Sequence, residues 1–299
     1  MGPGPGAARV KLGIIGGSGL GQLPGLAGQE RRIETPWGPP SDALLEGEIA
    51  GLPVAFLPRH GRGHRIAPSE LNARANIAAL RMAGCRALLS LSAAGSFRED
   101  LPPGSFCIVT QIVDETHGRP STFFGDGIVA HVSLARPVAE DLVARVAAAA
   151  AAAGVPYRTG GTYCCIEGPR FATRAESLAR RAAGFDVVGM TAMPEAALAR
   201  EAEMAYALVA MVTDFDAWSA VHVTTGEVLA VVRANAAKAA ALVEAVAAAL
   251  VRDPLPIPSA DGWERALDGA VVTDRSAWPE AARARLAVIA PRLFAEEQP

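Results

Sequence analysis

The sequence predicts an α/β protein with a largely parallel or mixed sheet. Runs of strand length alternate with segments of helical spacing through most of the 299 residues, as in proteins that pack helices on a central sheet. Several of these runs lead directly into glycine-rich or polar segments. The length suits one large α/β domain or two small ones, and a hydrophobic content of 51% is enough for a sizeable core.

Eight runs, most of them apolar and bounded by turn residues, predict the strands. In chain order they are residues 10–15, 43–49, 52–57, 87–91, 106–113, 162–166, 187–188 and 205–212. Five segments of helical spacing predict the helices, at residues 69–83, 137–153, 173–183, 194–203 and 224–250. Gly84, Gly154 and Gly184 directly follow three of these helices, as C-caps commonly do. Thr224 or Thr225 is the predicted cap of the last helix, and Glu227 completes a predicted capping box with Thr224.

We expect one main domain at residues 10–252, with a flexible leader at residues 1–9 and an extension at residues 253–299. The leader lacks the charged and apolar regions of a signal peptide. The character of the chain changes at the proline-rich run that begins after Asp253, and only weak helical patterns follow it.

Composition and charge exclude several classes of protein. The net charge is −3 and the pI about 6.0, so the chain lacks the basic excess of a nucleic-acid binder. No apolar stretch of about 18 residues is free of charges, so no membrane span is predicted. The four cysteines form no C-x-x-C pair and no zinc-site spacing with histidine. We therefore expect free thiols in a reducing cytoplasm, and no metal site.

A glycine-rich run, Gly16-Gly17-Ser18-Gly19, follows the strand at residues 10–15. Backbone N–H groups in such a turn can converge on an anion, and Ser18 adds a hydroxyl donor. No lysine follows the run, and Gln22 stands where a dinucleotide motif has its last glycine, so neither nucleotide-binding motif fits. Taken alone, the run is equally well explained as a tight turn.

A basic segment follows the strand at residues 52–57. Arg59 carries a planar guanidinium that suits phosphate oxygens, and His60 can donate a second hydrogen bond. Alone, this segment could be a solvated basic loop. Because it and the glycine-rich run each follow a strand, we favour a shared oxyanion site.

Small residues, Ser92-Ala93-Ala94-Gly95-Ser96, follow the strand at residues 87–91. They allow a ligand to approach closely, and their hydroxyls and amides can bind an anion; ordinary helix-capping serines are the alternative. The spacing is not G-x-S-x-G, so a serine hydrolase is not predicted.

Two acids, Asp214 and Asp216, directly follow the strand at residues 205–212 and share a face if the backbone is extended. Carboxylates there are costly unless they are paired, and ligands of α/β proteins bind where strands end. Adenine offers N7 as an acceptor and its 6-amino group as a donor, so one protonated and one ionised aspartate can bind it. Neighbouring acids push their pKa values apart, which suits this division. A solvated turn or a helix cap is the alternative.

Seven motifs, in order along the chain, resemble the trimeric purine nucleoside phosphorylases. They are GIIGGSGL at residues 13–20, ETPWGPPS at 34–41, RHG at 59–61, NARAN at 72–76, EGPRF at 167–171, GMTAMPE at 189–195 and TDFDAW at 213–218. The last motif points to the methylthioadenosine phosphorylase branch. The resemblance covers roughly residues 10 to 250.

The resemblance implies a mixed, partly barrel-like sheet flanked by helices, in a homotrimer or a dimer of trimers. It implies reversible, phosphate-dependent cleavage of the N-glycosidic bond of 5′-deoxy-5′-substituted adenosines, above all 5′-methylthioadenosine. The products are adenine and a 5-substituted ribose 1-phosphate. Inorganic phosphate is the co-substrate, and no metal or organic cofactor is required.

The resemblance also implies roles for individual residues. The phosphate ligands would be Ser18, Arg59, His60, Ser92, Ala93 and Thr191. The nucleoside would contact Phe171, Gly189, Met190, Thr213, Asp214, Asp216, Val228, Leu229, His64 and, from a neighbouring subunit, His131. The catalytic residues would be Asp214, Asp216 and His60.

Two departures from the family pattern keep other activities open. Gly189 stands where the methylthioadenosine branch carries asparagine, as in 6-oxopurine and methylthioinosine relatives. The segment beyond residue 253 is not part of the usual module and could pack over the active-site mouth or at a subunit interface. The alternatives are a 5′-halo-5′-deoxyadenosine phosphorylase, a 6-oxopurine or methylthioinosine phosphorylase, and a non-catalytic nucleotide-binding regulatory module. The last would leave Arg59, His60 and the two acids unexplained.

Overall fold

The computed structural model describes residues 10–219 and 225–295. The leader predicted at residues 1–9, the predicted cap Thr224 and the last four residues of the predicted extension lie outside these ranges.

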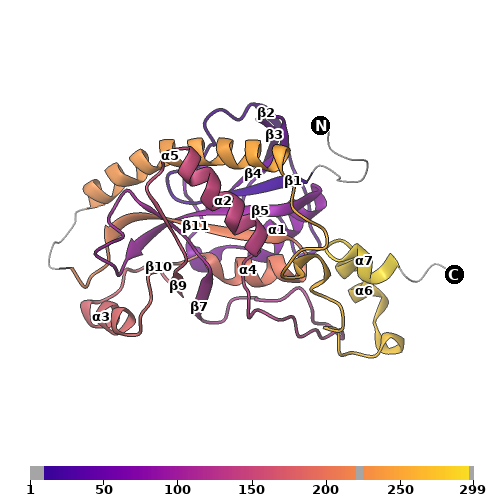
Figure 1. Cartoon of the computed structure of the whole chain (residues 1–299). Helices are drawn as coiled ribbons and strands as arrows, with labels where there is room; N and C mark the ends of the chain where they lie inside the picture. Colours follow the sequence, from indigo (N-terminus) through magenta and orange to yellow (C-terminus); the bar gives the residue numbers. More distant parts are fainter. Residues whose placement is uncertain (1–9, 220–224, 296–299) are drawn as a thin grey trace.

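A mixed sheet of eleven strands forms the centre of the described protein (Figure 1). The strands are β1 (Lys11–Gly16), β2 (Gly28–Arg31), β3 (Leu44–Ile49), β4 (Leu52–Pro58), β5 (Cys85–Ser96), β6 (Phe106–Ile108), β7 (Gln111–Glu115), β8 (Tyr157–Thr159), β9 (Thr162–Ile166), β10 (Val187–Gly189) and β11 (Ala205–Phe215). Along the main path the order is β2-β3-β4-β1-β5-β10-β9-β7, and β11, β6 and β8 form a branch from β5.

The sheet branches at β5, its longest strand. The first part of β5 pairs in parallel with β1, and β11 runs parallel to almost all of β5. At the far end, Gly95 and Ser96 also pair with β10 in the antiparallel direction. The carboxyl ends of β5 and β11 and the short strand β10 therefore meet in one place, and this place holds the site described below.

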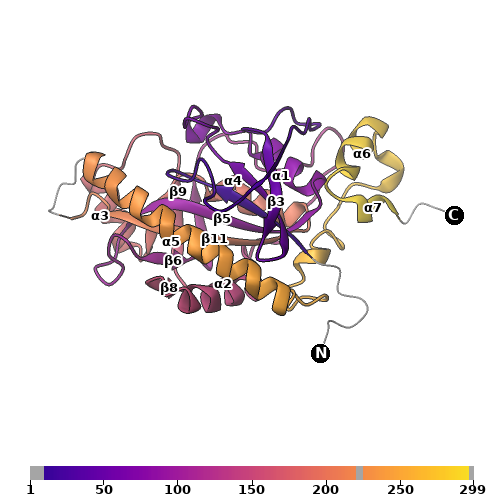
Figure 2. The ribbon, with the colours of Figure 1, turned by 90° about the horizontal axis from the view of Figure 1, so that it is seen from above.

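Helices cover the sheet on both faces. They are α1 (Ala73–Met82), α2 (Glu140–Ala152), α3 (Arg174–Ala182), α4 (Ala192–Glu201), α5 (Thr225–Arg252), α6 (Glu280–Ala287) and α7 (Pro291–Ala295). The long helix α5 packs against α2 and crosses the sheet, and α1 packs against α4 (Figure 2). The predicted α/β class, with a mixed sheet flanked by helices, is confirmed.

Helix α5 passes a composition test for membrane spans. Residues Gly226–Arg252 are long and apolar enough to cross a bilayer, although 44% of the most apolar window is buried inside the protein. Core helices have the same property, and α5 contacts α2, β4 and β11. The predicted absence of a membrane partner stays a prediction.

Several predicted boundaries differ from the structure, and three strands differ most. Residues 92–96, predicted as a loop, continue β5, because strand partners on both sides overrule the weak strand propensity of small residues. The single strand predicted at residues 106–113 is two strands, β6 and β7, which pair with different neighbours. β11 likewise continues to Phe215, with a register shift between Val212 and Asp214.

The segment from residue 253 onward forms one end of the molecule (Figure 1). Trp263, Leu267, Leu286 and Ile289 are buried in the same hydrophobic core as the sheet. Glu203, just after α4, accepts hydrogen bonds from the Leu267 amide and from the guanidinium of Arg292. The segment is thus packed onto the main domain, and the domain boundary at residue 253 stays a prediction.

Candidate active site

One cavity of about 310 Å³ brings together nearly all of the predicted site residues, and its size is typical of small-molecule sites, about 300–1,000 Å³. Its walls come from segments after β1, β4 and β9, from β5, β10 and β11, and from α5. Fifteen predicted residues line it: Ser18, Arg59, His60, His64, Ser92, Ala93, Phe171, Gly189, Met190, Thr191, Thr213, Asp214, Asp216, Val228 and Leu229.

Arg59 is fully buried and is held by its neighbours. Its Nε and Nη2 atoms donate to the two carboxylate oxygens of Glu195, at 2.5 and 3.2 Å. Nη2 also donates to Ser90 Oγ, and Nη1 donates to the Leu91 carbonyl. Burial works to lower the pKa of Arg59, but the Glu195 carboxylate outweighs it and raises the pKa. Four of the five N–H bonds are thus engaged, so Arg59 can offer an anion one N–H and its charge.

His60 lies beside Arg59 in the same wall. Its Nδ1 atom is 2.8 Å from the Ile66 carbonyl, and its ring stacks on His64 with centroids 4.3 Å apart. Burial lowers the pKa of His60 to about 4, and the charge of Arg59 adds to this effect. The ring is therefore neutral near pH 7, and the Nδ1 proton is donated to Ile66. Its Nε2 atom is then an acceptor, whereas the sequence predicted a donor to phosphate.

Hydroxyl groups line the wall next to Arg59. Ser92 Oγ lies 3.4 Å from Thr191 Oγ1, although these residues come from different elements. The glycine-rich turn after β1 closes this wall, where Gly17 donates its amide to the Leu91 carbonyl. A Cβ at Gly19, whose φ is +82°, would overlap Val232 of α5, so glycine is needed for the close approach of this helix. Hydroxyls, a buried cation and a neutral imidazole form a polar pocket of anion-binding character.

The two acids lie over Gly95 on another wall. A Cβ placed on Gly95 would be 3.3 Å from Asp216 Cβ and 3.6 Å from Asp214 Oδ2. Thr213 Oγ1 donates to Asp214 Oδ1 at 2.6 Å. Burial raises the pKa of Asp214; the Thr213 hydrogen bond opposes this rise and the charge of Asp216 adds to it. Asp216 is 7% exposed, and its Oδ2 atom is buried without a hydrogen-bond partner among the described residues.

The remaining walls are apolar. Val228 and Leu229 of α5 line the cavity, and so do Ile166 and Val232, which were not predicted. Val232 is one helical turn beyond Val228, so the spacing of the helix was the signal that could have found it. Phe171 also lines the cavity and is 76% exposed. The cavity therefore has an anion-binding part, an acid pair and an apolar part.

Comparison with known proteins agrees with this geometry. A family model described as the phosphorylase superfamily matches residues 11–248. The S-methyl-5′-thioadenosine phosphorylase of Bradyrhizobium diazoefficiens is 55% identical over 265 residues, 88% of this chain and 90% of that protein.

The chain belongs to the phosphorylase superfamily. The family that the seven motifs predicted is thereby confirmed. The protein of the same name from Koribacter versatilis is 45% identical over 97% of this chain and 99% of its own length. A crystal structure of a methylthioadenosine phosphorylase from an antarctic soil metagenomic library superposes with a TM-score of 0.88, at 42% identity, over 94% of this chain and 99% of that one.

The segment beyond residue 253 is shared with at least one of these phosphorylase relatives. An alignment over 97% of 299 residues leaves out about nine of them, fewer than the 47 residues from 253 to 299. The family model ends at residue 248, before this segment, so the expectation that the segment lies outside the usual phosphorylase module stays a prediction, although the Koribacter protein shares the segment.

The packing of Tyr163 explains why position 189 of the cavity is a glycine. A Cβ at position 189 would overlap the hydroxyl group of Tyr163 on β9. That hydroxyl is 3.4 Å from Ser92 Oγ, at the edge of the anion-binding wall. Tyr163 thus occupies the space that a side chain at 189 would need, and the departure at Gly189 is a consequence of the packing.

His131 is the one predicted residue outside the cavity. It is exposed, and its amide donates to the Ala270 carbonyl beside the bridge between Ala130 and Val271. The role predicted for it, in a neighbouring subunit, stays a prediction.

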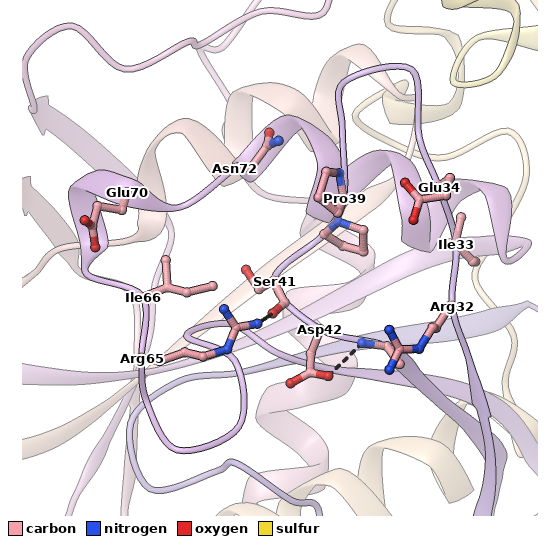
Figure 3. Close-up of a pocket in the computed structure, with 12 residues that line it drawn as sticks. Arg32, Ile33, Glu34, Pro39, Ser41, Asp42, Arg65, Ile66, Glu70 and Asn72 are labelled. Atoms are coloured by element: carbon pink, nitrogen blue, oxygen red, sulfur yellow. Dashed lines mark hydrogen bonds between the residues drawn. The ribbon is translucent and has the colours of Figure 1, made fainter.

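A larger cavity, about 600 Å³, lies against the loop that follows His60 (Figure 3). Two arginines and three carboxylates line it, together with seven other residues. Arg65 donates to the Ser41 carbonyl, and Asp42 accepts from the Ala43 amide. None of the predicted catalytic residues lines it, so we assign the chemistry to the smaller cavity.

Proposed function

We propose that the protein is an S-methyl-5′-thioadenosine phosphorylase. The observation that carries this proposal is the shared cavity, in which Arg59, Ser92 and Thr191 lie in one wall and Asp214 and Asp216 in another. Curated relatives of that name, at 45–55% identity, support the substrate. The 5′-halo, 6-oxopurine and regulatory alternatives are not favoured by these relatives.

In the proposed reaction, a phosphate oxygen attacks C1′ while the C1′–N9 bond breaks, through a transition state with oxocarbenium character. The charge of Arg59 and the hydroxyls of Ser92, Thr191 and Ser18 hold the phosphate, together with the backbone at Ala93. Because His60 Nε2 is an acceptor, it receives a hydrogen bond from the P–OH group of monohydrogen phosphate. No metal is required in this scheme, because phosphate is the nucleophile.

The bonding electrons of C1′–N9 move into the purine, and a proton must meet them. Asp214 Oδ1 already accepts from Thr213, so we place the proton of Asp214 on Oδ2, from which it passes to N7. Asp216, with an unpartnered buried oxygen, accepts from the 6-amino group. General acid catalysis of this kind contributes about 10²–10⁴-fold. Adenine leaves with the proton, and Asp214 is reprotonated from solvent.

The sugar and its 5′ group take the remaining space. The Met190 amide faces the 2′-hydroxyl, Phe171 lies by the base, and Gly189 lines the cavity beside Met190. Val228 and Leu229 surround the 5′-methylthio group, and His64 closes this end. Apolar contacts of this type discriminate by about 1–3 kcal/mol, which favours methylthio over hydroxyl.

We infer a homotrimer, or a dimer of trimers, in which His131 closes the 5′ pocket of a neighbouring subunit. The exposure of His131 and the open position of Phe171 support this assembly. We also infer a cytoplasmic location, because all four cysteines are free and buried, as expected of a protein in a reducing compartment.

A substrate panel tests the proposal. Release of free base is measured for 5′-methylthioadenosine, adenosine, a 5′-chloro analogue, methylthioinosine and inosine, each with and without phosphate. We expect the highest kcat/KM for methylthioadenosine, and only with phosphate. A higher kcat/KM for inosine or methylthioinosine would show a 6-oxopurine activity instead of the proposed one. If none of the nucleosides is cleaved, the proposed function is refuted.

A further inference from the structure

Arg119 lies outside every sequence motif and outside the cavity lining, in the segment after β7. Its side chain is only 8% exposed. Its guanidinium donates to the segments that carry two cavity walls. On one side it contacts Met190, which lines the cavity, and Met193; on the other it contacts Glu167, which directly follows the lining residue Ile166.

The first wall needs an outside donor because its backbone is irregular. Thr191, directly before α4, has φ −134° and ψ −8°, and Met193, at a kink in the first turn of α4, has φ −112° and ψ 135°, so neither is helical. A non-helical backbone interrupts the regular helical pairing of carbonyls, and buried carbonyls need a donor. Arg119 Nη1 supplies it to the Met190 and Met193 carbonyls, at 2.8 and 2.9 Å.

The second wall is held by the other edge of the same guanidinium. Arg119 Nη2 donates to the Glu167 carbonyl at 2.7 Å, and Nε lies 3.2 Å from both carboxylate oxygens of Glu167. Glu167 begins the loop that carries Pro169 and Phe171 into the cavity. The planar group therefore sets the separation of this loop from the Met190 segment.

We propose, on the basis of the function proposed above, that Arg119 is a positioning residue of the active site. It orients the peptide between Met190 and Thr191 by holding its carbonyl, and since the peptide is planar, it also fixes the amide of Thr191. Through Glu167 it keeps the Phe171 loop in register with that peptide. Lysine cannot replace it, because a point charge on a flexible stem lacks the rigid fork of donors.

The test compares Arg119→Lys and Arg119→Met with Arg180→Met. Arg180 is a matched control: it is 15% exposed, forms a 2.8 Å ion pair with Glu115 of β7, and its side chain forms no hydrogen bond with residues 167–171 or 189–194. Melting temperature, kcat and the KM values for phosphate and nucleoside are measured for each. Misplacement remote from the chemistry can cost up to about 100-fold, so we expect kcat/KM to fall about 10- to 100-fold in both Arg119 variants and less than about twofold in Arg180→Met. Equal kcat/KM in the Arg119 and Arg180 variants would overturn the proposal.

Hydrogen exchange keeps the proposal testable without reference to activity. We expect amides at residues 167–171 and 187–195 to exchange faster in Arg119→Lys than in the wild type, and to be unchanged in Arg180→Met. Unchanged exchange at both segments in Arg119→Lys would overturn the proposal even if the enzyme were inactive on every nucleoside. A wild-type protein that cleaves no nucleoside, with exchange faster as expected, would refute the proposed function and leave Arg119 as the organiser of this cavity.

Discussion

The hydroxyl group of Tyr163 occupies the space that a Cβ atom at Gly189 would need. Tyr163 is fully buried and Gly189 lines the cavity, so neither residue can change freely without the other. The glycine, which in the sequence suggested a 6-oxopurine preference, is therefore explained by the packing of its neighbour.

We predict that Gly189→Ala destabilises the protein by about 1–3 kcal/mol, the usual cost of overpacking a core. Tyr163→Leu removes the ring that a Cβ at position 189 would overlap. The double variant Gly189→Ala/Tyr163→Leu should therefore lose less unfolding free energy than the sum of the losses in the two single variants. Urea unfolding of the four proteins measures the coupling. Additive losses would show that the two side chains do not compete for space.

Arg59 and Glu195 form a buried ion pair, so each depends on the other. We predict that Arg59→Met costs about 3–5 kcal/mol, since it leaves the Glu195 carboxylate buried without its cation. The double variant with Glu195→Met should regain stability but not phosphate binding. Denaturation and phosphate KM are the measurements; phosphate affinity that returns in the double variant would remove Arg59 from the phosphate site.

Asp214 gives a prediction for pH. Its pKa is raised by burial, so the carboxyl group stays protonated to higher pH than usual, and activity on adenine nucleosides should fall as pH rises through that pKa. Asp214→Asn should lower kcat/KM for methylthioadenosine by about 10²–10⁴-fold and abolish the fall of activity at high pH. Inosine-type substrates should be spared or improved. An unaltered adenine preference in Asp214→Asn would contradict the assignment.

His60 gives a prediction for stability. Its folded pKa is about 4 and its ordinary value is 6.5, so between these values the unfolded chain binds a proton that the folded protein does not. This part of the stability is present above pH 6.5 and is lost as pH falls to 4, with a slope approaching about 1.4 kcal/mol per pH unit. His60→Asn should flatten this slope relative to the wild type. The matched variant His117→Asn, at an exposed histidine, should keep the wild-type slope of stability against pH. Equal slopes in the wild type, His60→Asn and His117→Asn would refute the lowered pKa of His60.

Local sequence signals predicted most of the fold. The strand predicted at residues 162–166 has the bounds of β9, and the helix predicted at 173–183 contains α3, capped by Thr173. β2 and β8 were missed because each is short and mostly exposed, with no apolar run. The extension of β5 through residue 96 was missed for another reason: its small residues are held in the strand by partners far away in sequence.

Some features of the site, like some of the fold, were predictable from local sequence and others were not. Most of the residues that line the cavity could be named from the family resemblance that the seven motifs carry, but Ile166 and Val232 could not. What could not be named were the pairings across the chain: Glu195 with Arg59, 136 residues apart, and Arg119 with Met190, 71 residues apart. The neutral state of His60 depends on its burial and on the position of Ile66, which only the folded structure shows.

The most direct measurement of the central claim follows both products of one reaction. The protein is incubated with 5′-methylthioadenosine and phosphate, adenine is quantified by chromatography, and the sugar ester by phosphorus NMR. The account predicts equal amounts of adenine and 5-methylthioribose 1-phosphate, with neither formed when phosphate is left out. Adenine released without phosphate, or no cleavage at all, would contradict it.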